Sequence, residues 1–178
     1  MFGLRLKPEI TTPRLFLRPP EMRDAEALVA QINDADIARM TTGIPHPYSL
    51  NQARAFISMA EQADADIDLP LIIEHRQKGL AGVVGLHRRE APFAELGYWL
   101  GRDFWGQGLA TEAGSALVQW AEEAKGRRAL ISGHFADNPA SGRVLEKLGF
   151  LYTGEVKARK SYARLTPTRT RMMVRVSG

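Results

Sequence analysis

The sequence predicts one α/β domain in the α+β arrangement, and three observations lead to that fold class. The chain has 178 residues and no repeat, low-complexity stretch or linker, so residues 1–178 are expected to form a single domain. Hydrophobic residues make up 44% of it and charged residues 25%, which suits a core that needs no disulfide or metal. Strand-like segments alternate with helix-like ones along its length.

The first half of the chain is expected to contain a strand, two helices and a hairpin. In the motif RLFLRP, Leu15 and Leu17 have the alternation of a short strand, which Pro19 and Pro20 end. Ser49 is a typical N-cap for the second helix. The turn HRQKG separates the two strands of the hairpin. The expected elements are a strand around 15–17, helices at 24–32 and 50–63, a loop at 41–48 and strands at 69–74 and 80–87.

The second half is expected to place a helix between two parallel strands. That helix ends at Gly126, and a right-handed crossover through it makes the strands on either side parallel. A ligand then belongs at the carboxyl ends of those strands. Asn138 and Pro139 begin the next helix, which Gly149 ends. The expected elements are strands at 93–100, 129–135, 150–156 and 169–176 and helices at 109–125 and 138–148.

The stretch LGRDFWGQGLAT, at residues 100–111, has the features of a pyrophosphate-binding turn. Gly106 and Gly108 let the backbone bend sharply and leave its N–H groups uncovered by side chains. A helix begins within two residues, and its first N–H groups lack partners within the helix and carry the positive end of its dipole. Such a helix start is an anion site. A plain tight turn is the alternative, and neither the P-loop nor the GxGxxG pattern is present.

The segment AELGYWLGRDFWGQGLATEA resembles the acyl-CoA-binding motif of the GNAT acetyltransferase superfamily, Gln/Arg-x-x-Gly-x-Gly/Ala. Trp105 stands at the first position of that pattern and departs from it, whereas Gly108 and Ala110 match. The WGxGxAT form, TPRLFLRP near the start and DNPASGRVLEKLGF at 137–150 resemble the branch that includes the ribosomal-protein N-terminal acetyltransferases. This resemblance, over roughly residues 11–176, implies a mixed, mostly antiparallel sheet of six to seven strands with a splayed parallel central pair, flanked by four helices.

The resemblance also implies the residues that bind acetyl-CoA, the acyl donor. The pyrophosphate is expected on the glycine turn, and the pantetheine arm along the backbone of the preceding strand, where the two central strands part. Asn138 matches an asparagine that contacts pantetheine in relatives, and helix capping is its other explanation. The expected cofactor-binding residues are Tyr98, Trp99, Leu100, Trp105, Gly106, Gln107, Gly108, Leu109, Ala110, Thr111 and Asn138.

Acetyl transfer needs a base, because an amine attacks only when neutral and amino groups have pKa values of about 8 to 10.4. The resemblance implies that Glu95, on the strand that holds the thioester, is this base. The rival candidates are Asp68, His87 and His134. The tyrosine that protonates the leaving thiolate in many relatives is replaced here by Leu145, and Ser141 is expected to substitute for it.

These features predict an enzyme that transfers an acetyl group from acetyl-CoA to a primary amine, with a protein N-terminal α-amine favoured as the acceptor. A small-molecule amine is the alternative acceptor, and a non-catalytic acyl-CoA-binding module is the alternative function. The wall of the acceptor site is expected at residues 36–65. Asp34 and Asp36 are acids that could attract a cationic acceptor, although solvated acids are commoner.

Composition excludes several other kinds of site. The chain has no cysteine, which excludes disulfides, thiolate zinc sites and a cysteine nucleophile. Histidines at 46, 75, 87 and 134 lack ligand spacing, so no metal is expected. No signal-peptide core and no run of about 20 apolar residues is present, which predicts a cytoplasmic protein without a membrane partner.

The net charge of +4 favours an anionic ligand. Seven Lys or Arg and no acid occur in residues 157–178, and they are expected on a solvated strand face. A nucleic-acid site there is disfavoured because no aromatic series interleaves the charges. The last strand could pair across a homodimer.

Overall fold

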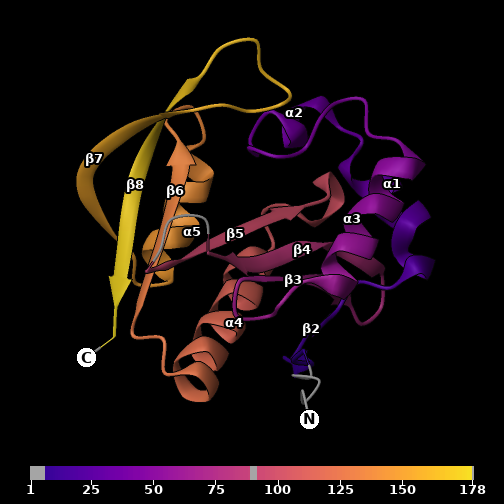
Figure 1. Ribbon diagram of the computed structural model, residues 1–178, viewed down its shortest axis with the longest axis horizontal. Helices are drawn as coiled ribbons and strands as arrows, with labels where there is room; N and C mark the ends of the chain where they lie inside the picture. Colours follow the sequence, from indigo (N-terminus) through magenta and orange to yellow (C-terminus); the bar gives the residue numbers. More distant parts are fainter. Residues whose placement is uncertain (1–6, 89–91, 178) are drawn as a thin grey trace.

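The computed structural model describes residues 7–88 and 92–177, and in this part of the chain eight strands form one mixed sheet (Figure 1). Their spatial order is β1-β2-β3-β4-β5-β6-β8-β7. All neighbouring strands are antiparallel except β5 and β6, which are parallel. The strands are β1 (Ile10–Thr11), β2 (Leu15–Arg18), β3 (Asp68–His75), β4 (Gly79–His87), β5 (Ala94–Leu100), β6 (Ala129–Phe135), β7 (Leu151–Arg159) and β8 (Thr168–Val176).

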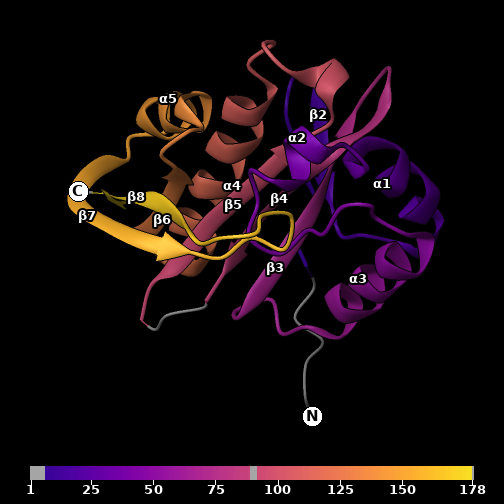
Figure 2. The same cartoon turned by 90° about the horizontal axis from the view of Figure 1, so that it is seen from above.

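Helices cover both faces of the sheet, with α1 and α3 on one face and α4 and α5 on the other (Figure 2). The helices are α1 (Ala25–Ile32), α2 (Ala35–Ala38), α3 (Leu50–Gln62), α4 (Leu109–Lys125) and α5 (Pro139–Lys147), with 3₁₀ turns at η1 (Met22–Asp24) and η2 (Arg102–Phe104). Among the described residues, none of these helices has both the length and the apolar character to cross a bilayer.

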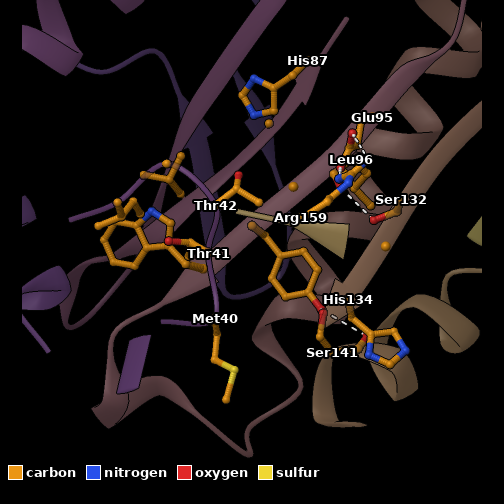
Figure 3. Close-up of a pocket in the computed structure, with 18 of the residues that line it drawn as sticks. Met40, Thr41, Thr42, His87, Glu95, Leu96, Ser132, His134, Ser141 and Arg159 are labelled. Atoms are coloured by element: carbon orange, nitrogen blue, oxygen red, sulfur yellow. Dashed lines mark hydrogen bonds and ion pairs between the residues drawn. The ribbon is translucent and has the colours of Figure 1, made fainter. Parts of the chain in front are cut away.

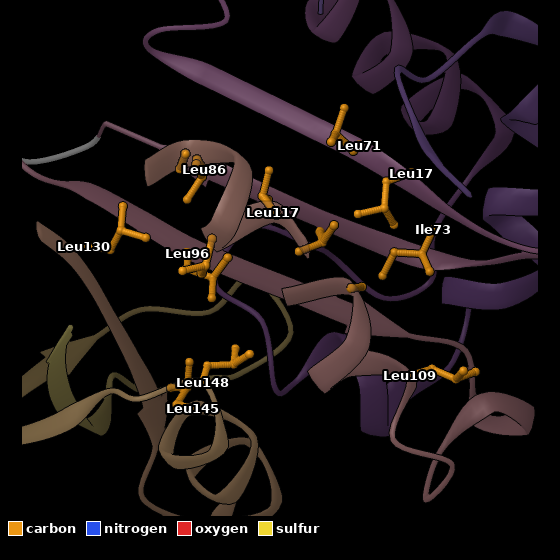
Figure 4. Close-up of a cluster of buried hydrophobic side chains, with 14 of the residues drawn as sticks. Leu17, Leu71, Ile73, Leu86, Leu96, Leu109, Leu117, Leu130, Leu145 and Leu148 are labelled. Carbon is orange, nitrogen blue, oxygen red and sulfur yellow. The ribbon is translucent and has the colours of Figure 1, made fainter. Parts of the chain in front are cut away.

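The larger core fills the space between the sheet and α4 and α5 (Figure 4). Alternate residues of the central strands, among them Leu71, Leu86 and Leu96, point to this face because side chains alternate along a strand. Leu109 and Leu117 of α4 pack against them. Each fully buried leucine contributes about 1.5–3 kcal/mol. This packing fixes the start of α4 against the end of β5.

Helix caps confirm several of the predicted boundaries. Ser49 and Gln52 form a capping box, in which each side chain accepts the backbone N–H of the other, at 3.2 and 2.8 Å. The Asn138 side chain accepts the Ser141 N–H at 3.3 Å and begins α5. Gly126 ends α4 at φ 61°, a left-handed conformation that glycine adopts without strain.

The central parallel strands pair only where they begin. Ala94 lies opposite Leu130 and Glu95 opposite Ile131, and no later pair of residues is in register. Beyond them, the Ser132 hydroxyl donates to the Leu96 carbonyl at 2.8 Å. The strands then diverge toward their carboxyl ends, as Figure 1 shows. The predicted splayed pair is therefore confirmed.

The structure has one strand and one helix more than predicted. Strand β1 has two residues and α2 is a single turn, and both are too short for hydrophobic periodicity to reveal. Strand β7 also continues to Arg159, past its predicted end at 156. Its register against β8 shifts between Tyr152 and Val156, around Gly154 at φ 85°, so a bulge carries the strand through a turn-like sequence.

Candidate active site

A cavity of about 330 Å³, here called the reaction cavity, lies where β5 and β6 part (Figure 3). Strands β3, β4 and β5 supply one side of it, and β6, the start of α5, β7, β8, residues 40–44 and Phe56 of α3 supply the rest. The side chains that bring chemistry to it are Asp68, His87, Glu95, Tyr98, Ser132, His134, Asn138, Ser141 and Arg159. The sequence-predicted catalytic residues and the start of the predicted coenzyme site therefore meet at one place.

The loop between β7 and β8 follows Arg159, which lines this cavity, and contacts the segment after α2. It reaches toward α2 (Figures 1 and 2), where the Tyr162 N–H donates to the Thr42 carbonyl at 3.1 Å. Arg164 donates from Nε to the Arg39 carbonyl at 2.6 Å and pairs with Asp137 at 2.8 Å. The C-terminal hairpin and the segment after α2 are thus tied together over the site.

The glycine turn presents a row of available backbone donors. Gly106 and Gly108 have φ values of 70° and 76°, which turn the chain sharply before α4. The first hydrogen bond of the helix runs from the Glu112 N–H to the Gly108 carbonyl at 3.0 Å. Within residues 7–88 and 92–177, no acceptor occupies the N–H groups of residues 106–111. These donors lie at the positive end of a 17-residue helix, which is the arrangement that favours an anion.

Arg14, which sequence analysis did not identify, braces this turn from the N-terminal strands. Its Nη1 donates to the Gln107 carbonyl at 2.9 Å, and its Nε pairs with Glu112 at 2.7 Å. The Thr12 hydroxyl donates to the same carboxylate at 2.6 Å. A Cβ on Gly108 would lie 3.7 Å from Arg14 Nη2, so the guanidinium lies beside the turn and adds positive charge there. The signal was present in the motifs TPRL and ATEA, whose charged residues pair across the fold.

The other residues of the turn shape it without using those backbone donors. The Trp105 indole donates from Nε1 to the Leu100 carbonyl at 2.9 Å, and the Arg102 guanidinium lies 4.9 Å from the centre of the same ring. The Gln107 amide donates to the Asp103 carbonyl at 2.7 Å. The side chain of Leu109 packs in the core, so only its backbone is available to a ligand.

Tyr98 and Ser141 form a hydrogen-bonded pair at the opening between β5 and α5. Their hydroxyl oxygens are 2.7 Å apart. Burial raises the pKa of Tyr98 to about 12, although the hydrogen bond with Ser141 opposes that shift. Tyr98 therefore stays protonated at neutral pH. When its O–H donates to Ser141 Oγ, the Ser141 proton is left to point elsewhere, toward the cavity that both residues line.

Glu95 faces the reaction cavity but is already paired. Both of its carboxylate oxygens accept hydrogen bonds from the Arg159 guanidinium, one of them at 3.2 Å, and the two side chains lie together in Figure 3. Both are largely buried, at 13% and 16% exposed. Both carboxylate oxygens of Glu95 are therefore engaged by one guanidinium, and a bidentate pair of this kind holds the carboxylate in one orientation.

His87 has the opposite arrangement. Its Nδ1 is hydrogen-bonded to Asp68, and its Nε2 has no partner among the described residues. The ring lies over Gly85 and Gly97, which are opposite each other in β4 and β5. A Cβ on Gly85 would come within 2.9 Å of Nε2, and one on Gly97 within 3.8 Å. The two glycines thus make room for an imidazole that presents Nε2 to the cavity.

His134 is held as a structural residue. Its Nδ1 lies 2.9 Å from the Phe135 carbonyl and its Nε2 lies 3.0 Å from the Tyr152 hydroxyl. A Cβ on Gly142 would approach Nε2 to 2.8 Å, so α5 packs directly on this pair. With both ring nitrogens engaged, His134 has no free position for proton transfer.

Arginines neutralise the acids that were considered for attracting a cationic acceptor. Asp34 and Asp36 both pair with Arg102, each at 2.7 Å, and neither lines the reaction cavity. Hydrogen bonds from Arg102 lower the pKa of Asp34 to about 2. The basic C-terminal segment is also used internally. Besides Arg159 and Arg164, Arg175 pairs with Glu122, and Arg171 lies 4.7 Å from the centre of the Tyr152 ring.

No group of three or more His, Asp or Glu side chains within the described ranges is arranged to hold a metal ion.

Comparison with known proteins identifies the family and the fold. A family model described as the acetyltransferase (GNAT) domain matches residues 14–151. The chain is 32% identical over 154 residues to the uncharacterized N-acetyltransferase YoaA of Bacillus subtilis (strain 168), covering 84% of this chain and 86% of that protein.

Two solved structures show the same fold. The Microcin C7 self immunity acetyltransferase MccE, in complex with acetyl-CoA and AMP, superposes with a TM-score of 0.82 at 21% identity, covering 93% of this chain and 94% of that one. RimL, a ribosomal L7/L12 alpha-N-protein acetyltransferase in complex with coenzyme A, superposes with a TM-score of 0.81 at 20% identity, covering 95% and 98%.

Proposed function

The chain belongs to the GNAT acetyltransferase family, and we propose that it transfers the acetyl group of acetyl-CoA to a primary amine by direct attack in a ternary complex. One observation carries this proposal. The row of unpaired backbone donors at residues 106–111 lies at the end of β5, beside the opening between β5 and β6. Those donors suit the pyrophosphate of the coenzyme, and the opening suits its pantetheine arm.

The acceptor that we propose is the α-amine of a protein N-terminus. The likeness to RimL, which is a ribosomal-protein α-N-acetyltransferase, supports this proposal. So do the motifs that resemble the ribosomal-protein branch. An α-amine also has a pKa near 8, so a larger fraction of it is neutral at pH 7 than of a lysine side chain.

In the reaction, the neutral amine nitrogen attacks the thioester carbonyl carbon, and the C–S bond then breaks with its electron pair going to sulfur. We propose that Ser141 donates to this thiolate, as expected from the sequence. Its hydrogen bond with Tyr98 supports this role, because a Tyr98 hydroxyl that donates to Ser141 Oγ leaves the Ser141 proton available to the thiolate. Asn138 holds the Ser141 backbone through the helix cap and so positions this hydroxyl.

The proton of the attacking amine must pass to a base. His87 is the side chain that we propose for this step, with Asp68 orienting its ring, because its Nε2 faces the cavity without a partner among the described residues. Glu95, which the sequence predicted, lines the same cavity and is the rival, although Arg159 holds both of its oxygens. Comparison of kcat/KM for His87→Gln and Glu95→Gln distinguishes these two candidate bases.

The experiment that tests the function follows release of free coenzyme A thiol from acetyl-CoA. The acceptor panel contains peptides with ribosomal-protein N-termini, free amino acids, polyamines and aminoglycosides. Acceptor-dependent release is expected, fastest with a peptide. Binding of acetyl-CoA without release for any acceptor would favour the non-catalytic module, and failure to bind acetyl-CoA would contradict the coenzyme site itself.

A further inference from the structure

A second cavity, here called the side pocket, adjoins the reaction cavity on the face of the sheet that α1 and α3 cover. It has a volume of about 480 Å³. It shares Phe56, Val83 and Trp99 with the reaction cavity, together with residues 43–44, so the two cavities adjoin at these residues. An acceptor whose reacting amine lies beside His87 and Glu95 would therefore place its substituent in the side pocket.

The lining of the side pocket is apolar and rich in aromatic rings. Tyr48, Phe56 and Trp99 are half-buried, and Met59 and Tyr162 are 66% and 78% exposed. No Asp, Glu, Lys, Arg or His of the described chain lines it. Burial raises the pKa of Tyr48, as expected where water is scarce. Such a lining binds hydrocarbon and aromatic groups and offers no carboxylate as a counter-ion to a cation.

The nearby carboxylates are also unavailable to a second ammonium group. Glu95 is paired with Arg159. Asp34 and Asp36 are both paired with Arg102. Asp68 is bonded to His87. A polyamine or aminoglycoside that placed its reacting amine in the reaction cavity would carry another cation into an apolar space without a counter-ion, and removing that cation from water is costly.

We infer that the side pocket binds an apolar, preferably aromatic, group of the acceptor, so that the acceptor is a monoamine with a bulky apolar substituent. The group is either the substituent of a small arylalkylamine or a side chain at the start of a peptide, since both offer the same chemistry. This inference rests on the proposed function, because it defines the acceptor of the same site. Burial of a group the size of leucine or phenylalanine predicts a gain of about tenfold to a hundredfold in kcat/KM over a small amine.

The test measures kcat/KM at saturating acetyl-CoA for phenethylamine, isopentylamine, ethylamine and putrescine, and for two peptides that differ only in a first residue of Phe or Ser. Phenethylamine and isopentylamine are expected to exceed ethylamine and putrescine by at least about tenfold. The Phe peptide is expected to exceed the Ser peptide by a similar factor, and comparison of the better peptide with the better amine identifies the source of the group. Equal kcat/KM across apolar, small and dicationic amines would overturn the inference and leave the acetyltransferase function standing.

A matched pair of variants connects that preference to the side pocket. Ala55 is exposed on α3 and lines the pocket, so Ala55→Phe fills it without entering the core. Asn51 is exposed on the same helix and lines neither cavity, so Asn51→Phe is the control. Ala55→Phe is expected to lower the ratio of phenethylamine to ethylamine kcat/KM at least fivefold, and Asn51→Phe to preserve it, with acetyl-CoA affinity reporting that both proteins are folded.

An unchanged ratio in Ala55→Phe would overturn the assignment of the pocket. No acceptor-dependent turnover for any amine or peptide, with acetyl-CoA bound, would refute the proposed function and this inference with it.

Discussion

Replacing Gly106 by alanine tests whether the glycine turn holds the coenzyme. Gly106 has φ 70°, and a Cβ there would meet no heavy atom within 4 Å, so the substitution adds backbone strain without a clash. An L-residue in the left-handed region costs about 1–2 kcal/mol. The turn can relieve this strain only by rotating, which turns its N–H groups away from the anion site. Since 1.4 kcal/mol corresponds to a factor of ten, the Kd of acetyl-CoA is expected to rise about 5- to 30-fold.

Gly79 supplies a control with the same backbone cost. It is the first residue of β4, directly after a turn, at φ 77°, again with no heavy atom within 4 Å of a Cβ, and it lines neither the reaction cavity nor the side pocket. Gly79→Ala is expected to lose about as much stability as Gly106→Ala in urea unfolding and to keep the acetyl-CoA Kd of the unmodified protein. Isothermal titration with acetyl-CoA measures the affinities. Equal affinities for Gly106→Ala and Gly79→Ala would refute the assignment of the turn.

Three further predictions concern catalysis and stability. His87→Gln is expected to lower kcat/KM about 10²- to 10⁴-fold at unchanged acetyl-CoA Kd, and Glu95→Gln to lower it less; the reverse order would make Glu95 the base. Ser141→Ala is expected to lower kcat in thiol-release assays, most with acyl donors whose leaving thiol has the highest pKa; equal losses for all donors would exclude proton donation. Burial opposes ionisation of Asp24, but hydrogen bonds from Arg18 lower its pKa in the folded protein. The ionised carboxylate therefore stabilises the fold at pH values above its unfolded pKa of about 4, and this stabilisation is lost as the pH falls through the pKa of Asp24 in the folded protein. In urea unfolding, Asp24→Asn is expected to remove this acid-dependent loss of stability. It is also expected to lower the free energy of unfolding near pH 7 by up to about 3–5 kcal/mol, because the buried Arg18 guanidinium loses a charged partner. A variant whose stability depends on pH as in the unmodified protein would contradict this prediction.

The local structure of the proposed coenzyme site was predictable because its determinants are local. The left-handed conformations at Gly106 and Gly108 and the cap at Asn138 depend on residues a few positions away, and each is present where the sequence placed it. The brace from Arg14 was missed because its partners lie 93 and 98 residues away. A local pattern carries no information about such a pair until the strands are in place.

The choice among the candidate bases shows the same division between local and distant determinants. Glu95, His87 and Asp68 were all candidates for the base, and nothing in the neighbouring sequence showed which of them has a free proton-accepting atom. The separation comes from Arg159, 64 residues beyond Glu95, and from the register that sets His87 opposite Asp68 and its ring over Gly85 and Gly97.

The sequence by itself determined the fold class, the order of the elements, the glycine turn and the family resemblance, since periodicity, caps and turn residues act over a few neighbours. Only the tertiary structure decided which carboxylates are paired, which imidazole has a ring nitrogen without a partner among the described residues, and where the side pocket lies. These properties depend on side chains that approach from distant strands and helices, and the free energy of each charge depends on the partners and the water that packing leaves around it.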